Sequence, residues 1–368
     1  MRSREICTTL LLAMILLLVG CGGQGSSSTS ASETINTAKL TPSCFVGGAT
    51  PLIDNTAPDP LWTWSDPHVL KVNGEYWMYA SSTDNFVFPV KLYRLTSADD
   101  TGYVRNPVAP VLEPSAAGSW DAGGVETPAV VYFQGQYHLF WTGYPYPVGD
   151  PSYSVYDFRI GHATSSDGVT WTRDPGNPIV SPSPSDSDTS NDWYEYIVGE
   201  PGPVVYNGQI YLYFTAVGVD YDLGTSLQVI GLVTSADGYT WSAPQLVLKP
   251  DQSLWPRGDG WVGYSTPNAI VLNNAVHLFY DVAYDPTGTN WKQVRLHHSW
   301  SNDGTAGWVQ DATPIASVGQ YAWNTDEIGS PDALLDGTTL RLYYAGHNMP
   351  VSAAPNLEIA EKTCDLSP

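Results

Sequence analysis

Residues 199–213, GEPGPVVYNGQIYLY, contain the pattern that decides the fold. The segment begins with Glu-Pro, and the apolar residues that follow alternate with smaller ones, as is typical of a half-buried strand. Asn207-Gly208 follows, and this dipeptide is a strong signal for a two-residue hairpin turn. The aromatic segment from Ile210 to Tyr213 then predicts a second strand that pairs with the first.

The same unit recurs five times along the chain. Its starts are Ser65-Asp66-Pro67, Glu126-Thr127-Pro128, Gly199-Glu200-Pro201, Ser265-Thr266-Pro267 and Gly329-Ser330-Pro331. The prolines of this set are 61, 73, 66 and 64 residues apart. A third strand and a Ser-x-Asp turn follow in the first four units, and in three of them a Trp opens a fourth strand.

Four strands per unit, repeated five times without a helical segment, predict an all-β, five-bladed β-propeller. We expect it to form a single domain over residues 44–368. A β-sandwich is the competing fold, but it does not need so long a repeat. The fifth unit is short, so the segment from Cys44 to Ile53 is expected to supply its outer strand.

The N-terminus resembles a bacterial lipoprotein signal. Its apolar run is too short to span a membrane, and it ends in Leu18-Val19-Gly20-Cys21, which resembles a lipobox. We therefore expect a signal peptide over residues 1–20, lipidation of Cys21, and a flexible Gly/Ser/Thr-rich tether over residues 21–43. An ordinary signal peptide with a chance cysteine is the alternative. The first interpretation predicts an exported lipoprotein, anchored at the outer membrane or cell surface.

Two further cysteines, Cys44 and Cys364, lie near the two ends of the mature chain. In an oxidising compartment we expect a disulfide between them, which would close the ring of blades. Two free buried thiols are the alternative.

The composition restricts the partners. With 15 basic and 37 acidic residues the chain carries a net charge of −22 at pH 7, which disfavours nucleic acid and anionic membrane surfaces. Its 14 Trp and 23 Tyr suit an all-β protein whose surface meets sugar rings. We expect a monomer that binds a carbohydrate and touches the membrane only through its N-terminal lipid.

Three carboxylates stand at the starts of three consecutive blades. The first strand of each propeller blade lines the central channel, so Asp66, Glu126 and Glu200 are expected to face one pocket. Carboxylates that share a pocket raise one another's pKa, so at least one should stay protonated near neutral pH. A paired acid and base is what cleavage of a glycosidic bond requires.

These features resemble glycoside hydrolase families 43 and 32. The shared features are five blades, Asp-Pro at the start of blade one, an acid on blade two and a Glu on blade three. Residues 160–171, IGHATSSDGVTW, are also similar to those propellers, and the resemblance covers about residues 50 to 363. It implies a glycoside hydrolase with arabinofuranosidase- or xylosidase-like chemistry.

The resemblance also implies roles. In family 43 Asp66 would be the general base, Glu200 the general acid, and Glu126 the residue that tunes the acid. In family 32 Asp66 would be a nucleophile. Blade two has Glu-Thr-Pro in place of Asp-Pro, and Glu200 lies one residue out of the family's register. Either Glu126 or Glu200 could therefore be the acid.

Other aromatic and polar residues near the inner strands are candidates for substrate binding, through stacking or hydrogen bonds. They are Trp64, Trp120, Asp121, Trp193, Asn268, Asp281 and Asp332. Repeated Trp residues could instead pack between blades, and Asp121 could cap a turn. Asp281 stands where the other blades have a small neutral residue, which suggests a hydrogen bond in the pocket or a pair with Arg295.

None of the seven histidines shows zinc-ligand spacing, so we expect no metal ligands and no required cofactor. Related propellers sometimes hold calcium in the channel, which leaves a structural calcium open. Three other functions also stay open: a non-catalytic glycan-binding lipoprotein, a structural propeller, and a phosphorylase like those of family 130. The last is disfavoured because basic residues are few.

Overall fold

The computed structural model describes residues 34–54, 63–84, 87–184, 189–288, 291–348 and 357–368. The expected signal peptide, the lipidation site Cys21 and the tether up to residue 33 lie outside these residues. Within the described part of the chain, no helix is long and apolar enough to cross a membrane.

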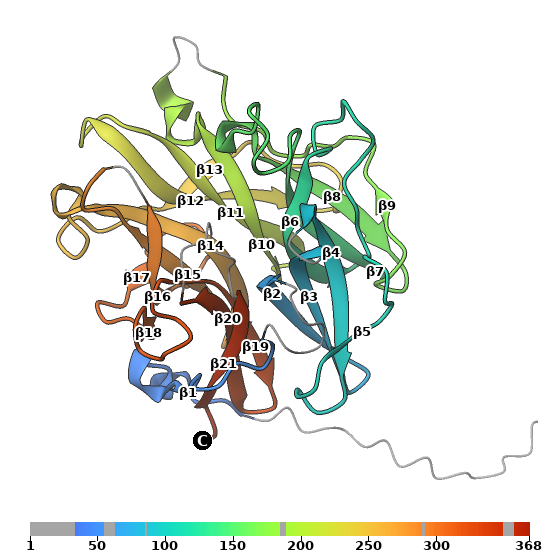
Figure 1. The fold of residues 1–368 in the computed structure, drawn as a ribbon. Coiled ribbons are helices and arrows are strands. Elements are labelled where there is room, and N and C mark those ends of the chain that lie inside the picture. The colour runs from blue at the N-terminus through green and yellow to red at the C-terminus, as the bar shows by residue number, and fades with distance from the viewer. Residues whose placement is uncertain (1–33, 55–62, 85–86, 185–188, 289–290, 349–356) are drawn as a thin grey trace, which may run out of the picture. The chain divides into compact units, whose positions relative to one another are not determined.

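In sequence order the described strands form five blades within four sheets (Figure 1). One parallel pair, Gln228 with Gly263, joins blades three and four into a single nine-stranded sheet, and the other strand pairs are antiparallel. Blades one and two contain β2 (Thr63–Val72), β3 (Glu75–Asp84), β4 (Val87–Ser97), β5 (Val104–Arg105), β6 (Gly124–Phe133), β7 (Gln136–Tyr144), β8 (Arg159–Ser165) and β9 (Thr172–Arg173). Blades three and four contain β10 (Ile197–Tyr206), β11 (Gln209–Asp220), β12 (Thr225–Ser235), β13 (Gln245–Leu248), β14 (Trp261–Leu272), β15 (Ala275–Tyr284), β16 (Lys292–Ser301), β17 (Val309–Gln310) and the short β18 (Ala316–Ser317). Blade five contains β19 (Glu327–Asp336), β20 (Thr339–His347), β21 (Glu358–Asp365) and β1 (Val46–Gly47).

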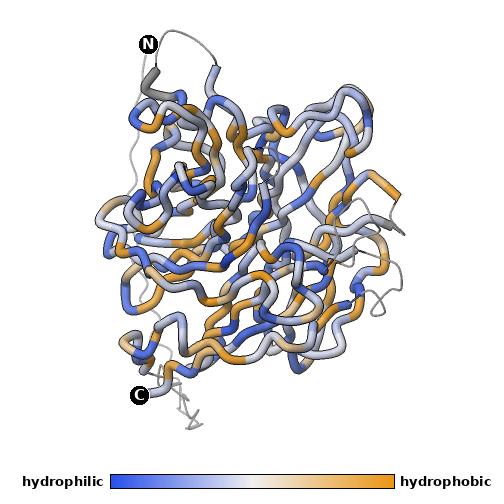
Figure 2. The backbone as a smooth tube through the Cα atoms, turned by 60° about the vertical axis from the view of Figure 1, so that its left-hand side comes forward, coloured by the Kyte–Doolittle hydropathy of each residue, from blue (hydrophilic) through white to orange (hydrophobic). Residues whose placement is uncertain are grey.

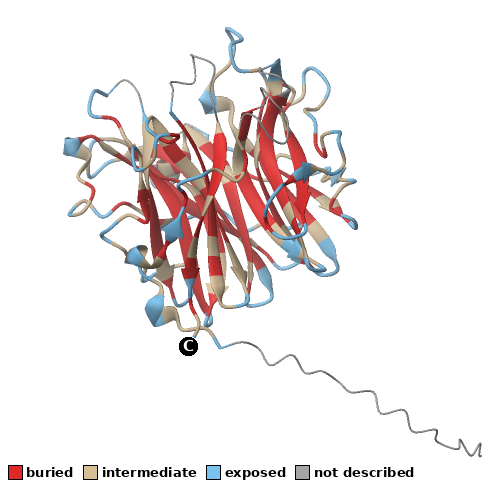
Figure 3. Cartoon of the chain, turned by 60° about the horizontal axis from the view of Figure 1, so that its bottom comes forward, coloured by how far each residue is buried: buried red, intermediate tan, exposed pale blue. Residues whose placement is uncertain are grey.

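The blades close into a ring. Their first strands contact one another in the cyclic order β2, β6, β10, β14 and β19, and β19 contacts β2 again. Each pair of consecutive blades shares one buried hydrophobic cluster; Met78 of blade one and Tyr343 of blade five, for example, belong to the same one. Buried residues follow the strands, and exposed residues gather in the loops at their ends (Figure 3). The predicted five-bladed β-propeller is confirmed.

Local turn chemistry explains why each unit folds as it does. Asn73-Gly74 and Asn207-Gly208 both have positive φ at their two residues, as a type I′ hairpin turn requires. Hydrophobic and hydrophilic residues interleave along the strands (Figure 2), so that buried side chains fill the space between blades.

The N-terminal segment completes blade five. β1 pairs with β21, with Val46 opposite Thr363, and a disulfide joins Cys44 to Cys364. Both predictions for this segment are confirmed. The expected tether is wrong for residues 34–43, because Ile35 and Leu40 pack against the cluster between blades four and five.

Candidate active site

The first strand of every blade has a bulge at its proline. The residue before the proline adopts a positive φ in all five blades: Asp66 (53°), Thr127 (52°), Glu200 (53°), Thr266 (45°) and Ser330 (52°). This conformation costs a residue with a Cβ about 1–2 kcal/mol, so the surrounding structure must hold it in place. Asp66 and Glu200 therefore share one repeat position, and Glu126 lies one residue earlier in its own repeat.

Hydrogen bonds between blades hold these positions. In four blades the backbone N–H of the bulged residue donates to a side-chain oxygen on the second strand of the preceding blade. The pairs are Thr127 with Ser81 (2.9 Å), Glu200 with Thr142 (2.7 Å), Thr266 with Thr215 (2.8 Å) and Ser330 with Asp281 (3.0 Å). The position singled out at Asp281 is thus a connector between blades.

Asp281 differs from the other connectors only in its charge. It is fully buried and also accepts hydrogen bonds from the hydroxyls of Ser265 and Thr266. Burial raises the pKa of Asp281 to about 6, although these donors oppose the rise. The expected pair with Arg295 is wrong, because that guanidinium lies over the Trp261 ring at 4.6 Å. A direct substrate contact is also wrong, because no part of Asp281 reaches the surface.

Each of the three predicted catalytic carboxyl groups has donors that orient it. Asp66 accepts hydrogen bonds from the hydroxyls of Ser330 (2.7 Å) and Ser65 (3.1 Å). Glu126 accepts one from the Tyr144 hydroxyl at 3.2 Å. Oε2 of Glu200 accepts one from the backbone N–H of blade four's bulged residue at 3.1 Å.

The pKa values of the two glutamates are shifted by burial and by neighbouring charges. Burial raises the pKa of Glu126 from 4.5 to about 8, and the charges of Asp66 and Glu200 add to the rise. Burial likewise raises the pKa of Glu200 from 4.5 to about 7, followed by the charges of Asp281 and Asp66. The structure thus brings together all three predicted residues and raises the pKa of Glu126 and Glu200 into the neutral range.

Two cavities open beside these carboxyl groups. A small cavity of about 30 Å³ lies on the ring axis, and both Asp66 and Glu200 line it. A larger one of about 490 Å³, here called the blade-three pocket, extends outward from Glu200. Its lining residues are Val155, Tyr156, Phe158, Tyr196, Ile197, Gly199, Glu200, Thr215, Val217, Ser226, Gln228, Gly288 and Trp291. The described residues that line the two cavities include no Lys or Arg.

Asn268 and Asp332 line the axial cavity but bond to the protein. Asp332 pairs with His68 at 2.8 Å and accepts from the Val69 N–H at 2.8 Å and from Asn268 at 2.5 Å. Burial opposes protonation of His68, but the Asp332 carboxylate outweighs it and raises the histidine's pKa. These buried bonds between blades replace the expected substrate contacts of Asn268 and Asp332.

The four remaining candidates for substrate binding lie between blades, outside the linings of both cavities. Trp64 is fully buried against Tyr93, Trp120 stacks on Trp141, and Trp193 stacks on Phe214. Asp121 is buried in an ion pair with Arg173. The expected substrate contacts of Trp64 and Asp121 are wrong, because both side chains are fully buried. Trp120 and Trp193 are partly exposed, and their substrate contacts stay predictions.

The sequence analysis missed the rim of the blade-three pocket. Tyr156 and Tyr196 pack edge to face at 5.9 Å on one side, and Trp291 lies among the lining residues from blade four. The sequence signal for the two tyrosines is the unusual length of the connections 144–156 and 182–196, because long connections between strands are often functional.

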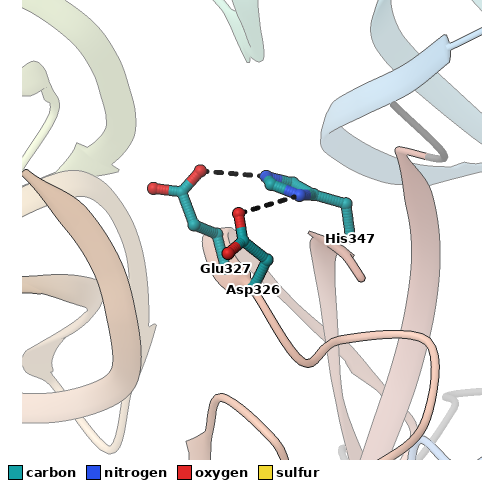
Figure 4. Close-up of side chains that lie close together, drawn as sticks. All are labelled: Asp326, Glu327 and His347. Atoms are coloured by element: carbon teal, nitrogen blue, oxygen red, sulfur yellow. Dashed lines mark hydrogen bonds and ion pairs between the residues drawn. The ribbon is translucent and has the colours of Figure 1, made fainter. Parts of the chain in front are cut away.

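One further cluster contains metal-ligand types. Asp326, Glu327 and His347 present nitrogen and oxygen atoms within 4.8 Å of one another. Figure 4 shows the His347 ring in contact with both carboxylates, which lie on the same side of it; its nitrogens are 2.9 Å from Glu327 and 3.7 Å from Asp326. The Lys292 ammonium also pairs with Asp326. Because these charges already satisfy one another, we assign no ion to the cluster.

Comparison with known proteins supports the fold. No family model matches the sequence. A 1,2-β-oligomannan phosphorylase of Thermoanaerobacter sp. (strain X514) is 29% identical over 153 residues, which cover 40% of this chain and 47% of that protein. The matched region thus spans about half the length of this relative.

Solved structures of glycoside hydrolases are similar over most of the chain. One described as a glycoside hydrolase superimposes with a TM-score of 0.64 at 15% identity, covering 90% of this chain and 92% of that one. A family 117 glycoside hydrolase from Zobellia galactanivorans gives 0.60 at 17%, covering 88% and 90%. An α-L-arabinofuranosidase from Lactobacillus brevis gives 0.59 at 14%, covering 85% and 92%. At these identities the likeness shows the fold.

Proposed function

We propose that this protein is a glycoside hydrolase that cleaves glycosidic bonds in a neutral poly- or oligosaccharide. The observation that carries the proposal is the group of three carboxyls, in which Asp66 lies beside two glutamates whose pKa values burial raises to about 8 (Glu126) and about 7 (Glu200). A carboxyl group with a raised pKa can supply the acid, and a second carboxyl group the base, that hydrolysis requires. The similar solved structures support this choice among the functions that a propeller can host.

The placement of the groups favours Glu200 as the acid. It lines both cavities, whereas Glu126 lines neither and is held by Tyr144. In the proposed step Asp66 takes a proton from water, the water oxygen bonds to the anomeric carbon, and the glycosidic C–O bond breaks. Glu200 donates its proton to the departing oxygen, and Glu126, held by the Tyr144 hydroxyl, stays beside them as a third carboxyl group.

Phosphorolysis is the second candidate, because the curated relative is a phosphorylase. It requires a site for inorganic phosphate, and such sites commonly contain Arg or Lys. The described lining of the two cavities has neither residue, which favours water as the acceptor.

The test is release of reducing sugar from arabinans, xylans, mannans, fructans and algal glycans, with and without inorganic phosphate. Asp66→Asn and Glu200→Gln should each lower the rate by about 100-fold or more. Glu113→Gln, an exposed carboxylate outside both cavities, is the matched control and should leave it unchanged. Phosphate-dependent release of sugar phosphate would establish phosphorolysis, and binding without turnover would establish a glycan-binding protein.

We also propose that the chain is exported and anchored through a lipid on Cys21. The disulfide between Cys44 and Cys364 supports an oxidising compartment. Metabolic labelling with a radioactive fatty acid, compared between the wild type and Cys21→Ser, tests this proposal.

A further inference from the structure

The blade-three pocket contains one polar group that the protein leaves unsatisfied. Gln228 projects from β12 and is 6% exposed, and its Oε1 has no hydrogen-bond partner among the described residues. A buried acceptor without a donor costs about 1–3 kcal/mol. Such groups are rare in native proteins and call for a specific explanation.

The neighbouring backbone makes room for this side chain. Gly263 lies against Gln228 with a φ of 143°, and a Cβ at that position would lie 2.8 Å from Cβ of Gln228 and 2.0 Å from its carbonyl oxygen. Only glycine permits so close an approach of β14 to β12. The backbone and Cβ of Gln228 therefore pack tightly against β14 in the wall of the pocket.

The rest of the lining has the character of a sugar site. Exposed Tyr156 and Trp291 and half-buried Tyr196 offer aromatic faces, onto which the C–H face of a sugar can stack. Ser226 adds a hydroxyl beside Gln228 in β12. The volume of about 490 Å³ lies within the range of about 300–1,000 Å³ that is typical of small-molecule sites.

The charge of the pocket selects the kind of sugar. Glu200 is the one ionisable acid in its lining, and no Lys or Arg is among the described lining residues. A uronate or sulfated sugar would place an unpaired anion beside the raised-pKa carboxyl of Glu200, at a cost in desolvation and repulsion. Hydroxyl groups both donate and accept hydrogen bonds, so an uncharged sugar satisfies Gln228 at no such cost.

We propose that the blade-three pocket is a subsite for one uncharged sugar residue, adjoining the bond to be cleaved, and that Gln228 hydrogen-bonds a hydroxyl of that sugar. The subsite rests on the proposed glycosidase function for its position next to Glu200. Gln228 acts here as a specificity-determining residue, which touches the substrate without taking part in proton transfer.

The test is calorimetric titration of the full chain carrying Asp66→Asn, which prevents turnover. The probes are arabinohexaose, xylohexaose, 1,2-β-mannotetraose and, as the acidic arm, trigalacturonate. At least one neutral probe should bind, and trigalacturonate should bind at least 10-fold more weakly. Gln228→Met, which keeps length and removes the polar atoms, should weaken the best neutral probe about 3- to 10-fold.

A second readout separates binding from structure. Because the ligand-free protein leaves Oε1 unsatisfied, Gln228→Met should leave the unfolding temperature unchanged or raise it, and Gln228→Leu serves as a second apolar variant. Gln245→Leu, an exposed glutamine in β13 of the same blade, is the matched control and should change neither quantity.

Several results would overturn the subsite. They are unchanged affinity in both Gln228 variants, a lower unfolding temperature in both, binding of no neutral probe, or equal binding of trigalacturonate. If the wild type hydrolyses a glycan and the Gln228 variants keep its KM, the subsite is wrong and the hydrolase stands. If nothing is hydrolysed but the binding of a neutral oligosaccharide depends on Gln228, the proposed hydrolase function is wrong and the proposed sugar site stands.

Discussion

Replacing Glu126 with Gln should stabilise the protein at high pH. The fold raises the pKa of this carboxyl through burial and through the charges of Asp66 and Glu200. Gln has the shape of the protonated side chain, and its carbonyl oxygen can still accept the hydrogen bond from Tyr144. The substitution therefore removes the charge that the native protein resists and keeps the contacts of the neutral form.

Proton linkage gives the direction in which the free energy of unfolding changes with pH. Between the ordinary pKa of 4.5 and the folded value of about 8, the native state holds a proton that the unfolded chain releases. The free energy of unfolding therefore falls as the pH rises through this window. The full pKa change corresponds to about 5 kcal/mol above the window. Partial exposure of Glu126 and sharing of the effect among three carboxyls reduce this, so we expect Glu126→Gln to stabilise by about 2 kcal/mol.

Urea unfolding of the wild type and Glu126→Gln at about pH 5 and about pH 9 measures the effect. We expect a small difference at the lower pH and higher stability of the variant at the higher pH. Glu113→Gln, which alters an exposed carboxylate, should show no pH-dependent difference. If Glu126→Gln destabilises equally at both values, Glu126 is ionised in the native protein and the proposed protonation pattern is wrong.

Two other substitutions test the ring itself. Asp281→Thr restores the kind of neutral connector found in other blades. Burial raises the pKa of Glu200 to about 7, and the substitution removes the Asp281 charge that adds to this rise. The alkaline limb of the pH–rate profile should move to lower pH with the fold intact, and an unmoved limb would contradict the tuning role. The double variant Cys44→Ser, Cys364→Ser opens a link between residues 320 apart and should cost about 2–4 kcal/mol in urea unfolding. Unchanged stability would show that blade five closes without the link.

The fold was predictable because its signals are local and repeated. Asn-Gly turns, a proline at the start of each first strand and alternating apolar residues specify one blade, and their fivefold recurrence specifies the ring. The carboxyl cluster followed from the same period, because equivalent positions of a ring converge on its axis. The pairing of β1 with β21 followed from the missing strand of the last unit.

The blade-three pocket was not predictable in the same way. Its rim comes from the connection before β8, the segment before β10 and the residue before β16, which share no position in the repeat. Gln228 looks like an ordinary strand residue, and its unsatisfied oxygen appears only when its neighbours are in place. The predicted substrate contact of Trp64 is wrong for a related reason. A Trp before an inner strand looks the same in the sequence whether it is buried between blades or exposed at the mouth of a pocket.

A charged residue that breaks the repeat indicates a catalytic role only when its position along the first strand of the blade is known. Asp66 and Glu200 depart at the bulge, where their side chains line the axial cavity, and Glu126 departs one residue earlier in its own repeat. Asp332 departs two residues after the bulged residue of its own strand, and there its carboxylate meets His68 of the next blade. A propeller repeat thus has one level where a carboxylate faces substrate and another where it joins blades, so charge alone does not identify the active residues.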